Sequence, residues 1–134
     1  MNRDLEQERA RYALKTIEER EKMLKKDDEK RARYLAKVKS LPATIIMCGL
    51  GQTAAMLLSV GKGQEGNPDQ MLYKDLENWL CANFERAPYR DESLMDAIIK
   101  NDRSAYIRAQ AEALKVLEWL RKFATASFSE GVKP

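Results

Sequence analysis

Apolar residues recur every three or four positions along most of the chain, a spacing that predicts helices with one buried face each. A first helix is predicted over about 3–26. A second is predicted from about 28, with Asp27-Asp28 as the break and cap between them. The inward residues are Ala10, Ala13, Leu14, Ile17 and Leu24 in the first helix, and Tyr34, Leu35 and Val38 in the second.

Proline interrupts the second helix, so a new and re-aimed helix is predicted from about 41 to 60. Ser40 is a natural N-cap in front of Pro42. The segment 41–61 carries no charge, which predicts that it forms the buried centre of the fold. It is long enough to cross a membrane, but its polar residues and amphipathic neighbours favour the core helix of a soluble protein.

The second half of the chain predicts three more helices in the same way. The glycine-rich stretch 61–67 predicts a flexible loop, after which Asn67-Pro68 begins a helix as cap and first residue. Ala87-Pro88-Tyr89 ends that helix, Asp91 is predicted to cap a short one, and the last is predicted over about 103–128. Their inward residues are Leu72, Leu76, Trp79, Leu80 and Phe84, followed by Leu94, Met95, Ile98 and Ile99. The predicted fold is all-α, a compact bundle of about five to six helices in a single domain, 1–134, with 1–3 and 129–134 frayed.

The last predicted helix is apolar over about two-thirds of its circumference, which predicts packing on several sides. Tyr106, Ala109, Ala113, Leu117, Leu120 and Ala124 share one side, and Ile107, Leu114, Val116, Trp119 and Phe123 widen it. The remaining polar stripe carries Arg108, Lys115 and Lys122 at intervals of seven residues.

Composition narrows the classes of protein that fit this pattern. The chain has 134 residues, the size of one domain. It contains no histidine, the commonest general base and zinc ligand, so no metal and no cofactor are expected. The two cysteines form no CxxC pair and the first residues are charged, so a reduced, cytoplasmic setting without a signal peptide is expected.

The net charge of +3 is unevenly spread along the chain. Residues 1–40 hold 13 basic and 9 acidic residues, and residues 102–134 hold 6 basic and 4 acidic. Residues 62–101 hold 5 basic and 8 acidic residues. Basic ends around an acidic middle permit contact with a polyanion but do not require it.

Two features suggest enzymatic chemistry, and each has a structural alternative. The run 49–54, Gly-Leu-Gly-Gln-Thr-Ala, matches the GxGxxA form of the dinucleotide fingerprint, which requires a parallel sheet. Close packing of helices on these glycines is the favoured interpretation. Two acidic clusters, Asp27-Asp28-Glu29 and Asp91-Glu92 with Asp96, match the carboxylates of a metal-dependent nuclease, but both lie at predicted helix starts, where capping is favoured.

Stripes of basic residues are the clearest functional signal, because phosphates are bound by such residues without a fixed motif. Lys30, Arg33 and Lys37 share one face of the second predicted helix, with Lys39 nearby. Together with the stripe of the last helix, this gives five candidate RNA-contacting residues: Lys37, Lys39, Arg108, Lys115 and Lys122. A solvated helix face is the alternative for each stripe. Trp119 is a candidate platform for a base, although a place in the core or in a subunit interface is favoured.

Several blocks of the sequence also form a recognisable pattern. They are residues 6–13 (EQERARYA), 37–43 (KVKSLPA), 49–53 (GLGQT), Leu72-Tyr73, Trp79-Leu80, 106–114 (YIRAQAEAL) and 118–124 (EWLRKFA). Their combination resembles the small α-helical subunit of type III-B CRISPR Cmr complexes, over nearly the whole chain. One departure is Cys48, where the family pattern has a polar residue, often asparagine, so a hydrogen bond made by that side chain is expected to be missing.

The resemblance implies a helical bundle without enzymatic activity that acts in antiviral defence. It implies copies stacked into a minor filament beside the backbone subunits that hold the guide RNA. It also implies contacts with the guide–target duplex, the target RNA and the large polymerase-like subunit. The five candidate residues come from the stripes, although Lys37, Lys39, Arg108 and Lys122 also lie in matching blocks. A purely structural protein-interaction domain is the main alternative, and a metal-dependent nuclease is the least favoured.

Overall fold

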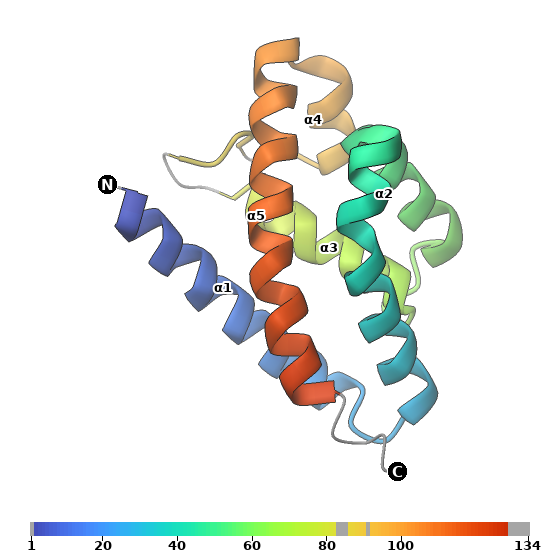
Figure 1. Ribbon diagram of the computed structural model, residues 1–134. Helices are drawn as coiled ribbons and strands as arrows, with labels where there is room; N and C mark the ends of the chain where they lie inside the picture. Colours follow the sequence, from blue (N-terminus) through green and yellow to red (C-terminus); the bar gives the residue numbers. More distant parts are fainter. Residues whose placement is uncertain (1, 83–85, 91, 129–134) are drawn as a thin grey trace.

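The computed structural model describes residues 2–82, 86–90 and 92–128, and it confirms the all-α prediction (Figure 1). The described residues form five helices and no strand. These are α1 (Asn2–Met23), α2 (Asp28–Gly61), α3 (Pro68–Leu80), α4 (Leu94–Lys100) and α5 (Arg103–Phe128). The predicted frayed tail 129–134, the predicted core residue Phe84 and the predicted cap Asp91 lie outside the described residues.

Most predicted helix starts are confirmed, because side-chain caps fix them locally. The Asp27 carboxylate accepts the Lys30 backbone N–H at 3.0 Å at the start of α2, and α3 begins at Pro68 behind its cap Asn67. The start of α4 was predicted wrongly. Its cap is Ser93, two residues after Asp91, because a serine hydroxyl serves the free amides of a first turn as well as an aspartate does.

The predicted break at residues 40–42 is wrong, because α2 runs through Pro42 and changes direction at Gly49 instead. Pro42 removes only one backbone hydrogen bond. Gly49 has φ 88° and ψ 159°, a conformation that glycine adopts far more easily than other residues. In Figure 1 the first arm of α2, residues 28–48, rises to this bend, and the second arm, residues 50–61, leaves it in a different direction.

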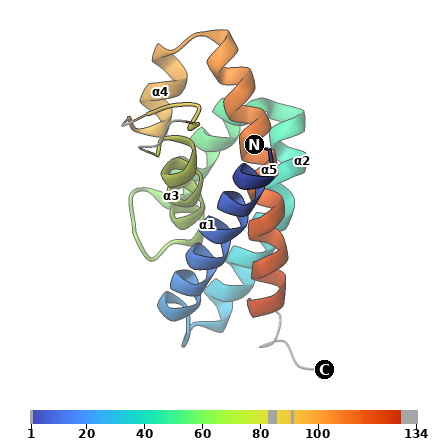
Figure 2. The same ribbon diagram turned by 90° about the vertical axis from the view of Figure 1, so that its left-hand side faces the viewer.

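The central helix of the bundle is α5, which packs against α1 on one side and α2 on the other (Figures 1 and 2). Packing on several sides was predicted for this helix and is confirmed. Its buried residues are Ala105, Ala109, Ala113, Val116, Leu117, Leu120, Ala124 and Phe128. The small alanines among them let the neighbouring helices approach closely.

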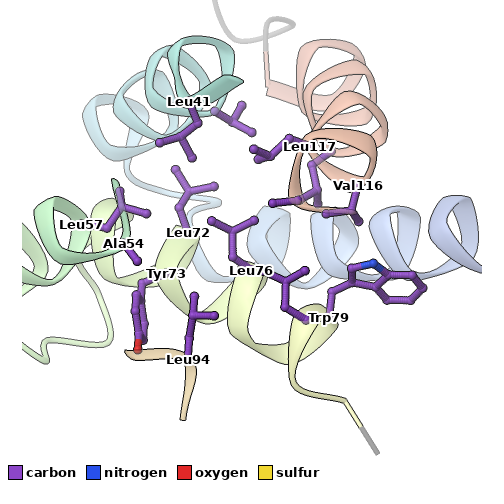
Figure 3. Close-up of a cluster of buried hydrophobic side chains, with 14 of the residues drawn as sticks. Leu41, Ala54, Leu57, Leu72, Tyr73, Leu76, Trp79, Leu94, Val116 and Leu117 are labelled. Carbon is purple, nitrogen blue, oxygen red and sulfur yellow. The ribbon is translucent and has the colours of Figure 1, made fainter. Parts of the chain in front are cut away.

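The apolar core is centred on α3, as Figure 3 shows. Leu72 and Leu76 of α3 lie between Leu41 of α2 and Leu117 of α5, and all four are at most 2% exposed. Burial of one such leucine stabilises the fold by about 2 kcal/mol. The core therefore joins α2, α3 and α5 into one unit, and α1 packs against it mainly through α5.

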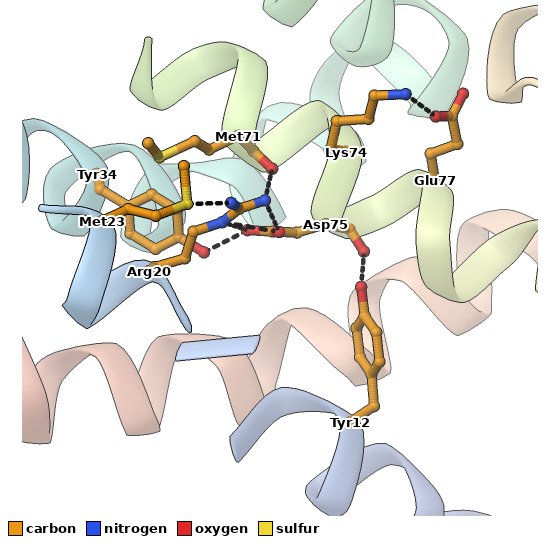
Figure 4. Close-up of polar contacts among 8 residues, drawn as sticks. All are labelled: Tyr12, Arg20, Met23, Tyr34, Met71, Lys74, Asp75 and Glu77. Carbon is orange, nitrogen blue, oxygen red and sulfur yellow. Dashed lines mark hydrogen bonds and ion pairs between the residues drawn. The ribbon is translucent and has the colours of Figure 1, made fainter. Parts of the chain in front are cut away.

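The helix α1 is joined to this unit by buried charge pairs. The Arg20 guanidinium donates to a carboxylate oxygen of Asp75 at 2.5 Å, and the Tyr34 hydroxyl donates to the other oxygen at 2.5 Å (Figure 4). Asp75 is 1% exposed. Burial raises the pKa of the Asp75 carboxyl, whereas Arg20 and Tyr34 act to lower it.

A second charge pair ties α1 to α5 and α3. Arg9 donates to both carboxylate oxygens of Glu112, at 2.6 and 2.8 Å. The Trp79 indole N–H donates to the same carboxylate at 2.8 Å. Charged partners of this kind lie far apart in the sequence, so only the packed helices bring them together.

The uncharged segment 41–61 was predicted to be the buried centre of the fold, and this is wrong for much of its surface. Ile46 is 70% exposed and Met47 is 82% exposed. On the second arm the residues at helical spacing 50, 53, 54 and 57 are buried, whereas 52, 55, 56 and 59 are exposed. The reason is that the bend lets each arm pack only one of its faces against the bundle.

Hydropathy alone therefore overestimates the buried fraction of α2 and its suitability as a membrane span. By length and composition α2 is the one described helix apolar enough to span a membrane, with 28% of its most apolar window buried inside the protein. The bend at Gly49 divides it into two arms of different direction. Neither arm by itself offers the roughly 20 consecutive apolar residues that a bilayer needs.

Candidate nucleic-acid interface

The three predicted cations of α5 form an exposed row on the side of the helix that faces away from the core. Arg108, Lys115 and Lys122 are all exposed, and intervals of seven residues place them about 10 Å apart along the helix axis. None of the three forms an ion pair with another residue that the structure describes. The row is thus a linear set of positive charges available to a ligand.

Trp119 lies beside this row but is committed to contacts within the protein. Its indole N–H donates to the Glu6 carboxylate of α1 at 3.1 Å, and its ring lies 5.8 Å from that of Phe123 at an angle of 33°. The sequence favoured a place in the core or in an interface for this residue. The structure gives it a half-buried position between α1 and α5.

The basic stripe of α2 has a different environment, because it lies against the start of α3. Arg33 and Lys37 both form ion pairs with the Asp69 carboxylate, at 3.2 and 3.4 Å. Asp69 is 1% exposed, and its Oδ2 atom has the Lys37 ammonium nearby but no hydrogen bond to a described residue. The buried carboxylate therefore neutralises part of this stripe. No local pattern around Lys37 or Asp69 predicts this pairing, because the two residues lie on different helices.

Lys37 and Lys39 do not share a surface, although they are two residues apart. Lys37 faces α3 through Asp69. Lys39 is exposed and lines a cleft of about 240 Å³ between α2 and the end of α5, with Arg31, Leu35 and Phe128. Of the five candidates, the structure thus brings together only the three on α5.

The glycine motif of residues 49–54 lies in the bend of α2 and not after a strand. Its free amides are occupied: the Leu50 N–H donates to the Gln110 side chain and the Gly51 N–H donates to the Tyr106 hydroxyl, both at 2.9 Å. Close packing on these glycines was the favoured interpretation, and it is confirmed. A β-carbon on Gly49 would lie 3.0 Å from the Tyr106 hydroxyl oxygen.

The acidic clusters were predicted to cap helices, and this holds for Asp27, whose carboxylate accepts the Lys30 N–H. In the second cluster Asp91 is outside the described residues, and Glu92 forms an ion pair with Lys100 at 2.8 Å. Among the residues that the structure describes, no group of three or more histidine, cysteine or acidic side chains converges on one point.

The fold and this surface define a class: a small all-α protein with a row of exposed cations on its central helix. Comparison with known families makes the assignment specific. The model of the CRISPR-associated protein family Cas_Cmr5 matches residues 5–127, which is most of the chain. The chain therefore belongs to this family, the small subunit of the type III-B CRISPR Cmr complex.

Proposed function

We propose that this chain is a non-catalytic subunit of the Cmr complex that binds the backbone of the guide–target RNA duplex through the α5 row. The observation that supports this most is the row itself: Arg108, Lys115 and Lys122 are exposed and have no ion-pair partner among the described residues. In an RNA-guided complex the guide recognises the target sequence by base pairing. The protein therefore needs to contact only the RNA backbone.

The physical mechanism is electrostatic. Each lysine or arginine that meets a phosphate releases condensed counterions, so affinity falls as salt rises. A row of three cations on one small domain binds weakly. In the proposed minor filament, copies stacked beside the backbone subunits and the large polymerase-like subunit align several rows along the RNA, and avidity then supplies most of the affinity. The cytoplasm is the proposed location.

The α2 candidates have a smaller role in this proposal. Arg33 and Lys37 are partly neutralised by Asp69, so their attraction for phosphate is weaker than that of a free pair. Lys39 is exposed and remains a candidate contact at a second position on the surface. The alternative function is a purely structural subunit that assembles with its partners without touching RNA.

The decisive experiment is RNA titration with the reconstituted complex at several salt concentrations. One variant carries Arg108, Lys115 and Lys122 all changed to glutamate. A matched control carries the same charge change on α1, at the exposed residues Arg11, Lys15 and Lys22. Sedimentation first confirms that each complex assembles.

We expect the α5 variant to lose affinity and to show a smaller slope of log K against log salt. The α1 control keeps both quantities closer to those of the unchanged complex. If the α5 variant assembles normally and neither quantity changes, the row is a solvated face and the structural alternative stands. A Lys39→Glu variant then tests the remaining α2 contact.

A further inference from the structure

Glu112 occupies a position of α5 adjacent to the row of cations, yet its ion pair is with another helix. It lies four residues after Arg108 and three residues before Lys115. Acidic and basic residues at these two spacings are neighbours on a helix surface and stabilise helices as ion pairs. In the structure, Arg108 and Lys115 have no ion-pair partner among the described residues. A contact from outside α5 therefore keeps this carboxylate from the row.

That contact is made by Arg9 of α1, which occupies both oxygens of the Glu112 carboxylate. Its Nη2 atom donates to Oε1 at 2.8 Å, and its Nε atom donates to Oε2 at 2.6 Å. The indole N–H of Trp79 donates to Oε2 at 2.8 Å from α3. A bidentate pair of this kind fixes the orientation of the carboxylate as well as its position. The Glu112 side chain is only 13% exposed, so it is held in the contact between α1 and α5.

Arg9 is itself held in place by a second carboxylate. Its side chain is 6% exposed, and its Nη1 atom donates to Glu6 of α1 at 2.9 Å. Glu6 also accepts the indole N–H of Trp119 at 3.1 Å. Each ion of this network has more than one partner, which restrains all of them. Because α1 packs along α5 (Figure 2), it supplies a fixed cation at the flank of the α5 row.

We propose that Arg9 is a positioning residue for RNA binding: it holds Glu112 against α1 and so keeps this carboxylate from pairing with the cations of the α5 row. The inference rests on the proposed function, because it concerns how the same row stays available to phosphate. Asp69 provides the contrast within this chain, since its carboxylate pairs with two cations of the α2 stripe. Without Arg9, Glu112 would neutralise the α5 row in the same way.

Release of Glu112 would remove the equivalent of one phosphate contact from each copy. A carboxylate that pairs with Arg108 or Lys115 cancels one positive charge, so one fewer counterion is released when RNA binds. At physiological salt one such contact contributes about fivefold to affinity. It also contributes about one unit to the slope of log K against log salt. These are the two quantities that loss of Arg9 is expected to change.

RNA titration of the reconstituted complex tests the proposal with a set of matched variants. Arg9→Met frees Glu112, and we expect affinity to fall about threefold to tenfold with a smaller salt slope. Adding Glu112→Gln removes the freed carboxylate, and we expect affinity to return to within about twofold of wild type. The control Arg11→Met makes the same change in net charge at an exposed position of α1. It is expected to stay within about twofold of wild type, because an exposed charge away from the row is screened.

Rescue by Glu112→Gln separates positioning from a merely structural role. If Arg9 only stabilises the packing of α1, the double variant loses as much affinity as Arg9→Met, because both lack the ion pair between α1 and α5. That result, or wild-type affinity of an assembled Arg9→Met complex, overturns the proposal. The triple glutamate variant of the row tests the proposed function separately. If that variant binds RNA normally, the row does not contact RNA, and the position of Glu112 is decided by the following experiment alone.

Zero-length carbodiimide crosslinking of the free chain follows Glu112 without RNA and without assembly. The reagent joins a carboxylate to an amine that it touches. In Arg9→Met we expect about fivefold or more of the amide between Glu112 and Lys115, relative to wild type, because the two are then neighbours on the helix surface. Peptide mass spectrometry measures the yield. The amide between Glu118 and Lys115, both exposed and three residues apart, is the internal reference and is expected to be equal in the two chains.

Circular dichroism establishes that each chain is folded at the temperature of the reaction. Arg9→Lys retains the charge without the bidentate fork, so it replaces Arg9→Met if that variant does not fold. We expect it to give a yield of the amide between Glu112 and Lys115 that lies above wild type and below a chain without the cation. A wild-type yield in the folded variant would mean that Arg9 does not hold Glu112 away from the row, and it would overturn the proposal.

Discussion

The hydroxyl oxygen of Tyr106 accepts a hydrogen bond from the backbone N–H of Gly51 at 2.9 Å, although the two residues lie 55 positions apart in the chain. With the matching bond from the Leu50 N–H to Gln110, it satisfies two amides that the break at Gly49 leaves without helical partners. The direction of the second arm of α2 is therefore set by α5. The four residues come from two of the sequence blocks that carry the family resemblance.

Replacing Gly49 by alanine tests whether the bend requires glycine. The residue has φ 88°, and a β-carbon would approach the Tyr106 hydroxyl at 3.0 Å. We expect the free energy of unfolding to fall by about 1–3 kcal/mol, measured by urea denaturation. Gly51→Ala is the control: its β-carbon meets Ile98 and Tyr106 at an ordinary 3.6 Å, so stability is expected to change by less than about 1 kcal/mol or to rise. Equal losses in both variants would contradict the role of the φ angle.

Removing the Tyr106 hydroxyl tests the contribution of α5 to the bend. Tyr106→Phe leaves the Gly51 N–H without its partner, and we expect a loss of about 1–2 kcal/mol in thermal or urea unfolding. Tyr89→Phe is a control of the same chemistry, because the buried Tyr89 hydroxyl has no hydrogen-bond partner among the residues that the structure describes. Its removal is expected to be neutral or stabilising. A larger loss at Tyr89 than at Tyr106 would contradict this account.

The buried ion pair between α1 and α3 is expected to matter far more than an exposed one. Arg20→Leu leaves the Asp75 carboxylate, 1% exposed, without its cation, and we expect a loss of about 3–5 kcal/mol. Arg11→Leu breaks the pair with Glu8, in which both side chains are more than half exposed, and should cost no more than about 0.5 kcal/mol. Urea denaturation of the two variants measures the difference. Similar small losses would mean that α1 is held by its apolar contacts alone.

Stability also separates the two basic stripes. Lys37→Met deprives the buried Asp69 carboxylate of one of its two cations, and we expect a loss of about 1–2 kcal/mol, since Lys37 is partly exposed. Lys115→Met removes a cation with no ion-pair partner among the described residues, and it is expected to leave the unfolding midpoint unchanged. Unchanged stability of Lys37→Met would mean that the ion pair with Asp69 contributes little. Lys37 would then count, like Lys115, as a cation available to a ligand.

The free energy of unfolding is expected to fall as the pH rises above about 8.5. Burial raises the pKa of the Cys81 thiol to about 12 and that of the Tyr73 hydroxyl to about 12. In the unfolded chain these groups lose their protons near pH values of about 8.5 and 10. Between those values and about 12 the unfolded state releases protons that the folded state keeps, so stability falls as pH rises.

Urea midpoints measured from pH 8 to 11 check this expectation. Cys81→Ser should flatten the decline, whereas the exposed Cys48→Ser should leave it as it was. A midpoint independent of pH over this range would contradict the protection of the buried groups.

The sequence by itself determined the helices and most of their ends. Caps such as Asp27 and Asn67 accept hydrogen bonds from amides two or three residues away. Their effect can therefore be predicted from neighbouring residues in the sequence. The apolar spacing of α5 likewise fixed which side is buried, and therefore that Arg108, Lys115 and Lys122 are exposed. These properties depend only on the helical period, which sets the residues that share a face whatever the neighbouring elements are.

The tertiary structure alone decided where α2 bends and which charges are free. Pro42 is the stronger local signal, yet the bend is at Gly49, because Tyr106 and Gln110 of α5 supply the partners that its open amides need. Lys37 and Lys115 look alike in the sequence, but only Lys37 meets a buried carboxylate from another helix. Both outcomes depend on contacts between residues distant in the chain, and no local pattern encodes which helices become neighbours.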